Sequence, residues 1–63
     1  MQPHQQRVVE EKTELDAKLL KLKEFKKGPI YASLDQFEQE RLDRQLGIMY
    51  AYSGVLAERI AAV

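Results

Sequence analysis

The sequence predicts an all-α fold, an antiparallel two-helix hairpin that assembles into a homo-oligomeric helical bundle. Three observations favour this architecture. Apolar residues recur at steps of three, four and seven, which is the spacing of a helix face and not the alternation of a strand. Only Pro3 and the pair Gly28-Pro29 punctuate the chain. The second helix also carries more apolar surface than one neighbouring helix can cover.

Length and composition bound the possible functions. A chain of 63 residues forms one domain at most. A single copy of this size buries so small a fraction of its surface that its stability as a monomer is marginal. The chain has no cysteine and one histidine, so disulfides and multi-histidine or thiolate metal sites are not expected. Ten basic and ten acidic residues cancel, which leaves no global field to attract nucleic acid or anionic lipid. Oligomerisation is the remaining route to stability.

The first helix is expected over residues 3–27. Pro3 suits a first helical turn, where its missing N–H is not needed. Gly28-Pro29 stops the helix and opens a linker over residues 28–33. The apolar stripe of this helix consists of Val8, Leu15, Leu19, Leu22 and Phe25.

The second helix is expected over residues 34–62. Ser33 and Gln36 have the spacing of a capping box at its start. Because the linker is short, the helix should fold back antiparallel to the first, as one helical-hairpin domain over residues 1–63. Its apolar stripe, with Tyr52 alongside, consists of Leu42, Leu46, Met49, Leu56, Ile60 and Val63.

A second face of this helix predicts contact between copies of the chain. Where a lone hairpin would place charges, it carries small and apolar residues: Gly47, Ile48, Ala51, Gly54 and Val55. Each glycine costs about 1 kcal/mol relative to alanine in a helix interior, and close approach of another backbone would offset that cost. The alternative is that the glycines are tolerated on a loose surface. The pattern does not specify the number of subunits.

Catalysis, metal chemistry and membrane insertion are not expected. The chain has no glycine-rich phosphate loop, metal-ligand spacing or nucleophile elbow, and solvated helix surface explains its carboxylates. We therefore expect no catalytic residues, no metal and no cofactor. The longest uncharged run, Gln45 to Ala57, has 13 residues, short of the ~18–20 that span a bilayer. The polar segment from Met1 to Glu10 lacks the apolar core of a signal peptide, so we expect a soluble, cytoplasmic protein.

Cationic and aromatic residues suggest a ligand site where the hairpin is open. There His4 and Arg7 come near Arg59, and arginine and tyrosine suit phosphate binding and base stacking. The alternative is a surface pair between Arg59 and Glu11 with the tyrosines in the core. A lysine cluster near residue 27 complements the negative helix end, and the alternative is a phosphate cradle: Lys21, Lys23, Lys26 and Lys27. The candidate ligand-binding residues are His4, Arg7, Lys12, Tyr50, Tyr52 and Arg59.

Two runs resemble small phage proteins of the crAss-phage-related hairpin family: Pro3-His4-Gln5-Gln6-Arg7-Val8-Val9-Glu10-Glu11-Lys12-Thr13-Glu14-Leu15 and Met49-Tyr50-Ala51-Tyr52-Ser53-Gly54-Val55-Leu56-Ala57-Glu58-Arg59-Ile60. That family is similar to the hairpins of phage anti-CBASS and anti-Thoeris sponges. The resemblance implies a homo-oligomer, commonly a hexamer, that sequesters a cyclic nucleotide immune signal without catalysis. It also implies phosphate-binding roles for Lys12 and Arg59. Those sponges often open with Tyr-His-Pro-Pro, whereas this chain opens with Met1-Gln2-Pro3-His4 and lacks the tyrosine.

The function that follows is a phage anti-defence sponge in the bacterial host cytoplasm. Its partners would be other copies of itself and a cyclic oligonucleotide or a cyclic ADP-ribose-like molecule, with no membrane and no long nucleic acid. The alternative is a non-catalytic, oligomeric helical adaptor that binds another protein. A nucleic-acid-associated factor using the lysine cluster is disfavoured by the zero net charge.

Overall fold

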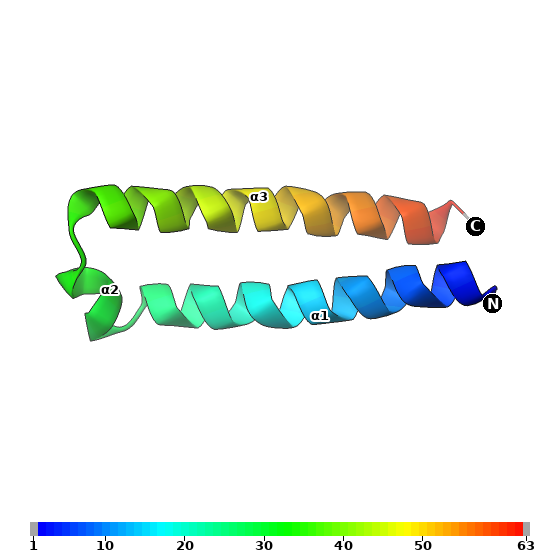
Figure 1. The fold of residues 1–63 in the computed structure, drawn as a ribbon, viewed down its shortest axis with the longest axis horizontal. Helices are drawn as coiled ribbons and strands as arrows, with labels where there is room; N and C mark the ends of the chain where they lie inside the picture. The colour runs from blue at the N-terminus through cyan, green and yellow to red at the C-terminus, as the bar shows by residue number, and fades with distance from the viewer. Residues whose placement is uncertain (1, 63) are drawn as a thin grey trace.

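The computed structural model describes residues 2–62 and forms an elongated helical hairpin of 45 × 15 × 13 Å. Its helices are α1 (Pro3–Lys26), α2 (Pro29–Ser33) and α3 (Gln36–Ala61). The long helices α1 and α3 lie side by side and run in opposite directions, with the start of α1 and the end of α3 at one end of the hairpin and α2 at the other (Figure 1). The all-α prediction is confirmed, although residues 2–62 form three helices where two were expected.

The start of α1 follows from its first residues. Pro3 occupies the first turn, and Gln2 before it is extended, with φ −69° and ψ 151°. The backbone N–H of Gln2 donates to Oε1 of Gln5 at 2.8 Å, so one polar group beside the helix start is satisfied locally. Helix α1 ends one residue before the predicted boundary, with Lys27 as its C-cap.

The predicted linker contains the short helix α2. Pro29 starts it, because proline fixes φ near the helical value and its missing N–H is not needed in the first turn. Gly28 before it is extended, with φ −90° and ψ 170°. The predicted linker over residues 28–33 thus contains one helical turn that was not expected, since the proline that ends α1 also begins this turn.

The cap of α3 also differs from the prediction. Ser33 is the last residue of α2, and its hydroxyl donates to the carbonyl oxygen of Ile30 at 2.7 Å. The N-cap is Asp35, whose carboxylate accepts from the backbone N–H of Glu38 at 3.0 Å. A charged carboxylate beside the positive helix end is a strong capping acceptor, so α3 begins at Gln36 and not at residue 34.

The two long helices meet along a seam in which inward-facing residues alternate in steps of three and four. The buried side chains of the described residues are Leu19 and Leu56, which are 8% and 0% exposed. Phe25 of the predicted stripe lies outside the seam and is 36% exposed, as does Tyr52, which was predicted beside the second stripe and is 43% exposed. Val63 lies outside the described residues. The seam consists of Val8, Lys12, Leu15, Leu19, Leu22 and Lys26 on α1 and of Leu42, Leu46, Met49, Ser53, Leu56 and Ile60 on α3.

Two polar contacts define the register of the seam. The Ser53 hydroxyl donates to Oδ1 of Asp16 at 2.6 Å, and the Lys26 ammonium lies 2.7 Å from Oδ1 of Asp43. From the first contact to the second, α1 advances ten residues and α3 goes back ten residues. The helices therefore keep one antiparallel register over this length.

Candidate functional site

The middle of the seam holds a polar network that includes one predicted ligand residue. Lys12 donates to Oδ2 of Asp16 at 2.6 Å, and Asp16 also accepts from Ser53 across the seam. The hydrogen bond from Lys12, followed by that from Ser53, lowers the pKa of the Asp16 carboxyl below its usual value. Lys12 is therefore half-buried and paired within its own chain, and a ligand phosphate at this position would share its ammonium with Asp16.

Three predicted ligand residues gather where the hairpin is open. His4, Arg7 and Arg59 are all exposed, and the N-terminal end of α1 lies beside the C-terminal end of α3 (Figure 1). Extending the seam register places Arg59 opposite Glu10 and Arg7 opposite Ala62. The ion pairs within residues 2–62 include neither arginine, so the expected alternative pairing of Arg59 with Glu11 is not observed there. Within the described residues, neither guanidinium group is paired with a carboxylate.

The two candidate tyrosines lie on opposite flanks of α3. They are two residues apart, which is about 200° around a helix. The Lys23 ammonium lies 5.7 Å from the ring centroid of Tyr50, on one flank. Tyr52 lies on the other flank. Arg59 lies on the same flank as Tyr52, seven residues further along and roughly 10 Å away along the helix axis. Both residues are exposed, by 48% and 43%, so neither lies in the core of the described hairpin.

A single chain therefore divides the predicted ligand residues between two regions. Lys23, beside Tyr50, is sixteen residues from Arg7, which is roughly 24 Å along α1. Tyr50 and Tyr52 differ by only about 3 Å along α3, so they are separated by flank: Tyr52 shares its flank with Arg59, and Tyr50 does not. A ligand that contacts all of these groups would need more than one copy of the chain.

The lysine cluster is largely engaged in contacts within the hairpin. Asp43 accepts from Lys26 and from the Tyr31 hydroxyl, at 2.7 and 2.8 Å. The Lys26 hydrogen bond, followed by that of Tyr31, lowers the pKa of Asp43, and the same contacts raise the pKa of Lys26 and of Tyr31. Lys27 lies 3.5 Å from the Glu24 carboxylate. These contacts connect the turn to α3 and support the structural interpretation of the cluster.

The predicted oligomer interface lies on the face of α3 that points away from α1. Ile48 and Val55 are 67% and 50% exposed, and Ala51 between them is exposed as well. A Cβ atom built on Gly47 or Gly54 would meet no atom within 4 Å. The five predicted interface residues thus form one continuous apolar face, the α3 outer face, that the described part of the chain does not cover.

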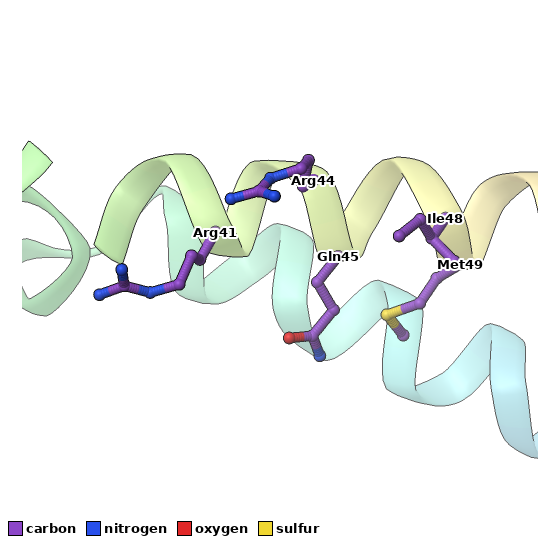
Figure 2. Close-up of a pocket in the computed structure, with 5 residues that line it drawn as sticks. All are labelled: Arg41, Arg44, Gln45, Ile48 and Met49. Carbon is purple, nitrogen blue, oxygen red and sulfur yellow. The ribbon is translucent and has the colours of Figure 1, made fainter. Parts of the chain in front are cut away.

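Beside the α3 outer face lies an arginine-lined depression of about 360 Å³. Figure 2 shows that its lining side chains all come from α3, which makes it a surface hollow and not a cleft between helices. The Arg41 guanidinium donates to Oε1 of Glu38 at 2.9 Å, whereas Arg44 is absent from the ion pairs of residues 2–62. The lining residues are Arg41, Arg44, Gln45, Ile48 and Met49.

Sequence reasoning missed this depression, although the spacing contained the signal. Arg41, Arg44 and Ile48 follow the same steps of three and four as the apolar stripe and continue the α3 outer face toward the turn. Elsewhere in residues 2–62, no group of three or more histidine or acidic side chains is placed to hold a metal ion. None of the helices described is long and apolar enough to cross a membrane.

Comparison with known proteins places the chain in a family. Neither the curated proteins nor the solved structures contain a match to it. The sequence model of the Sequestin family, in contrast, matches residues 2–62, nearly the whole chain. The family name denotes sequestration, and the matched range includes the seam, the open end and the α3 outer face. The chain therefore belongs to the Sequestin family.

Proposed function

We propose that this protein is a sponge that binds and sequesters a cyclic nucleotide signal of bacterial immunity. The observation that carries the proposal is membership of the Sequestin family over residues 2–62. The resemblance of residues 3–15 and 49–60 to phage anti-CBASS and anti-Thoeris sponges supports the ligand class. A cyclic oligonucleotide or a cyclic ADP-ribose-like molecule is small, anionic and aromatic, and arginine and tyrosine side chains suit such a ligand.

The open end would supply the phosphate contacts. Arg7 and Arg59 are exposed arginines outside the described ion pairs, and a guanidinium binds phosphate through two parallel hydrogen bonds. Lys12 would add a third cation, held in place by Asp16. His4 lies on the first turn of α1, at the rim of the same end. The net charge of zero favours a small ligand over a long polyanion.

Base recognition would require neighbouring copies. The rings of Tyr50 and Tyr52 face opposite flanks, so one chain offers each base a single aromatic surface. Symmetric assembly repeats both flanks around an axis and would let one copy supply the cations and another a ring. The sponges that the chain resembles commonly form hexamers. We therefore place the ligand between copies of the chain.

No bond is made or broken in this function. Sequestration lowers the free concentration of the signal, and its effector then stays unoccupied. The protein needs high affinity for the signal and enough copies to bind it. It needs no nucleophile, general base or cofactor. The bound molecule should therefore be recovered chemically unchanged after the protein is denatured.

Thermal unfolding with a panel of cyclic nucleotides tests the proposal. A ligand that binds only the native state stabilises it by about 2.7 kcal/mol at one hundred times its dissociation constant, which raises the melting temperature by several degrees. Arg59→Ala should abolish the shift. Lys21→Ala, which removes an exposed cation near the C-terminal end of α1, far from the open end, should preserve it. No shift with any ligand, together with an Arg59→Ala variant that matches the wild type, would refute the sponge.

An oligomeric adaptor for another protein is the second candidate. Two exposed apolar side chains favour it, Ile30 and Phe37 near the turn, which are 62% and 68% exposed. Neither residue belongs to the ligand site or to the α3 outer face. If the adaptor is correct, replacing both with serine should abolish binding of the partner protein while leaving any ligand-induced stabilisation unchanged.

A further inference from the structure

On the α3 outer face, charged, branched and small residues lie at positions symmetric about Ala51, with opposite charges at the two ends. Arg44 lies seven residues before Ala51, and Glu58 lies seven residues after it. All three side chains are exposed. They lie on the same face of α3, because seven residues are almost two complete turns. Between the two charges the face is apolar. One end of the face is therefore positive and the other end negative, about 21 Å apart.

The sizes of the side chains on this face follow the same symmetry about Ala51. Ile48 and Val55 lie three residues before and four after Ala51, on one edge of the face. Gly47 and Gly54 lie four before and three after it, on the other edge. The face thus has one edge of exposed branched side chains and one edge of bare backbone, where an added Cβ would touch nothing.

We infer that two copies of the chain pair through their α3 helices, antiparallel and centred on Ala51. In that arrangement each Arg44 lies opposite the partner's Glu58, so the dimer gains two ion pairs. Ile48 lies beside the partner's Val55, and both side chains leave water. Gly47 lies beside the partner's Gly54, which lets the backbones approach closely along that edge.

The arginine-lined depression is consistent with the same register. Its walls include Arg41, Arg44 and Ile48, which lie on the half of the face before Ala51 (Figure 2). The two-fold axis brings the opposite half of the partner helix over this hollow. The carboxylate of the partner's Glu58 then lies at its arginine-lined end, while the partner's Val55 covers Ile48. A cationic hollow and a carboxylate thus meet twice in one dimer.

Charge excludes the parallel alternative. Two parallel α3 helices in register would place Arg44 against the partner's Arg44 and Glu58 against the partner's Glu58. Like charges at matched positions repel, whereas the antiparallel pair brings opposite charges together at both ends. The α3 outer face is therefore complementary to itself only when the second helix is reversed, which is the condition for an isologous two-fold interface.

Cysteine cross-linking at the symmetry centre tests the register directly. The chain has no cysteine, so Ala51→Cys introduces a single thiol that meets its own copy at the two-fold axis. A disulfide needs Cβ atoms about 3.8 Å apart. Mild oxidation should give a species of twice 7.3 kDa. Ala17→Cys is the matched control, an equally small exposed residue on α1. Equal cross-linking rates for the two variants would overturn the proposed pairing.

A charge swap tests the orientation independently. Arg44→Glu alone and Glu58→Arg alone each place two like-charge contacts in the dimer, and each should raise the dimer dissociation constant about tenfold in light scattering at low salt. The double variant Arg44→Glu/Glu58→Arg restores opposite charges and should return the constant to the wild-type value. Single variants that dimerise like the wild type, or a double variant that is not restored, would overturn the antiparallel register.

This inference extends the self-association included in the proposed function, and the two can fail separately. Thermal unfolding with the cyclic nucleotide panel is measured on the cross-linked Ala51→Cys dimer as well. Cross-linking without any ligand-induced shift supports the interface and removes the sponge. A ligand-induced shift in a chain that cross-links no faster at position 51 than at position 17 retains the sponge and removes the interface.

Discussion

Leu56 provides the sharpest test of how the hairpin is held together. Its side chain is 0% exposed, the most complete burial among the described residues. Leu56→Ala removes three carbons from the seam, and about 0.8 kcal/mol per buried methylene gives about 2.4 kcal/mol. The cavity that remains raises the loss to about 3 kcal/mol. A domain of this length has a free energy of unfolding of roughly 3–9 kcal/mol, so the variant should be severely destabilised.

Leu20→Ala is the matched control, since it makes the same chemical change at a site that is 56% exposed. Less than half of the leucine surface is buried there, and the higher helix propensity of alanine offsets part of the loss, so we expect less than about 1 kcal/mol. Urea unfolding followed by far-UV circular dichroism, at one fixed protein concentration, measures both changes. If Leu56→Ala costs no more than Leu20→Ala, the seam does not provide the stability that the burial pattern indicates.

Three further outcomes follow from the polar contacts. Asp35→Ala removes the N-cap of α3 and should cost about 1 kcal/mol in urea unfolding, whereas Asp35→Asn should restore most of it. The pKa values of Asp16 and Asp43 lie below the usual 3.8, so their contribution to the free energy of unfolding is complete above that pH. It should be lost as the pH falls through the lowered values. Asp16→Asn/Asp43→Asn should flatten this dependence in acid urea titrations. The pKa of Tyr31 is raised above 10.0, because a phenolate cannot donate a hydrogen bond to Asp43. The stability that this contact provides is present below pH 10.0 and should be lost as the pH rises through the raised value. Tyr31→Phe should lessen this loss in alkaline urea titrations.

Much of the fold could be predicted from local chemistry. Pro3 starts α1, the Gly28-Pro29 pair ends it, and the apolar steps of three and four identify both long helices. The face carrying Ile48 and Val55 was predicted to lie away from α1, and the structure leaves both side chains exposed. These features depend on spacing along one helix, which a sequence records directly.

The turn was less predictable because two capping candidates compete within three residues. Ser33 and Asp35 both have the required side chain and spacing. Only when α2 forms does Ser33 lie at the end of a helix, where its hydroxyl meets Ile30 and leaves the cap to Asp35. The choice depends on the path of the backbone, which neither residue specifies alone.

The candidate ligand residues illustrate a second limit. The antiparallel hairpin predicts that Arg7 and Arg59 share an end, but it does not predict which flank each tyrosine occupies. That depends on the rotation of α3 against α1, which the contacts from Ser53 to Asp16 and from Lys26 to Asp43 determine. The same rotation puts Ser53 in the seam in place of Tyr52.

The sequence by itself thus determined the two long helices, their antiparallel direction and the surplus apolar face of α3, because helix propensity and periodicity are local properties of the chain. The tertiary structure decided the register of α1 against α3, the contact of Ser53 with Asp16 across the seam and the orientation of each tyrosine flank relative to α1. Those features arise from contacts between residues up to 37 positions apart, and rotating a helix by a fraction of a turn changes which side chains meet.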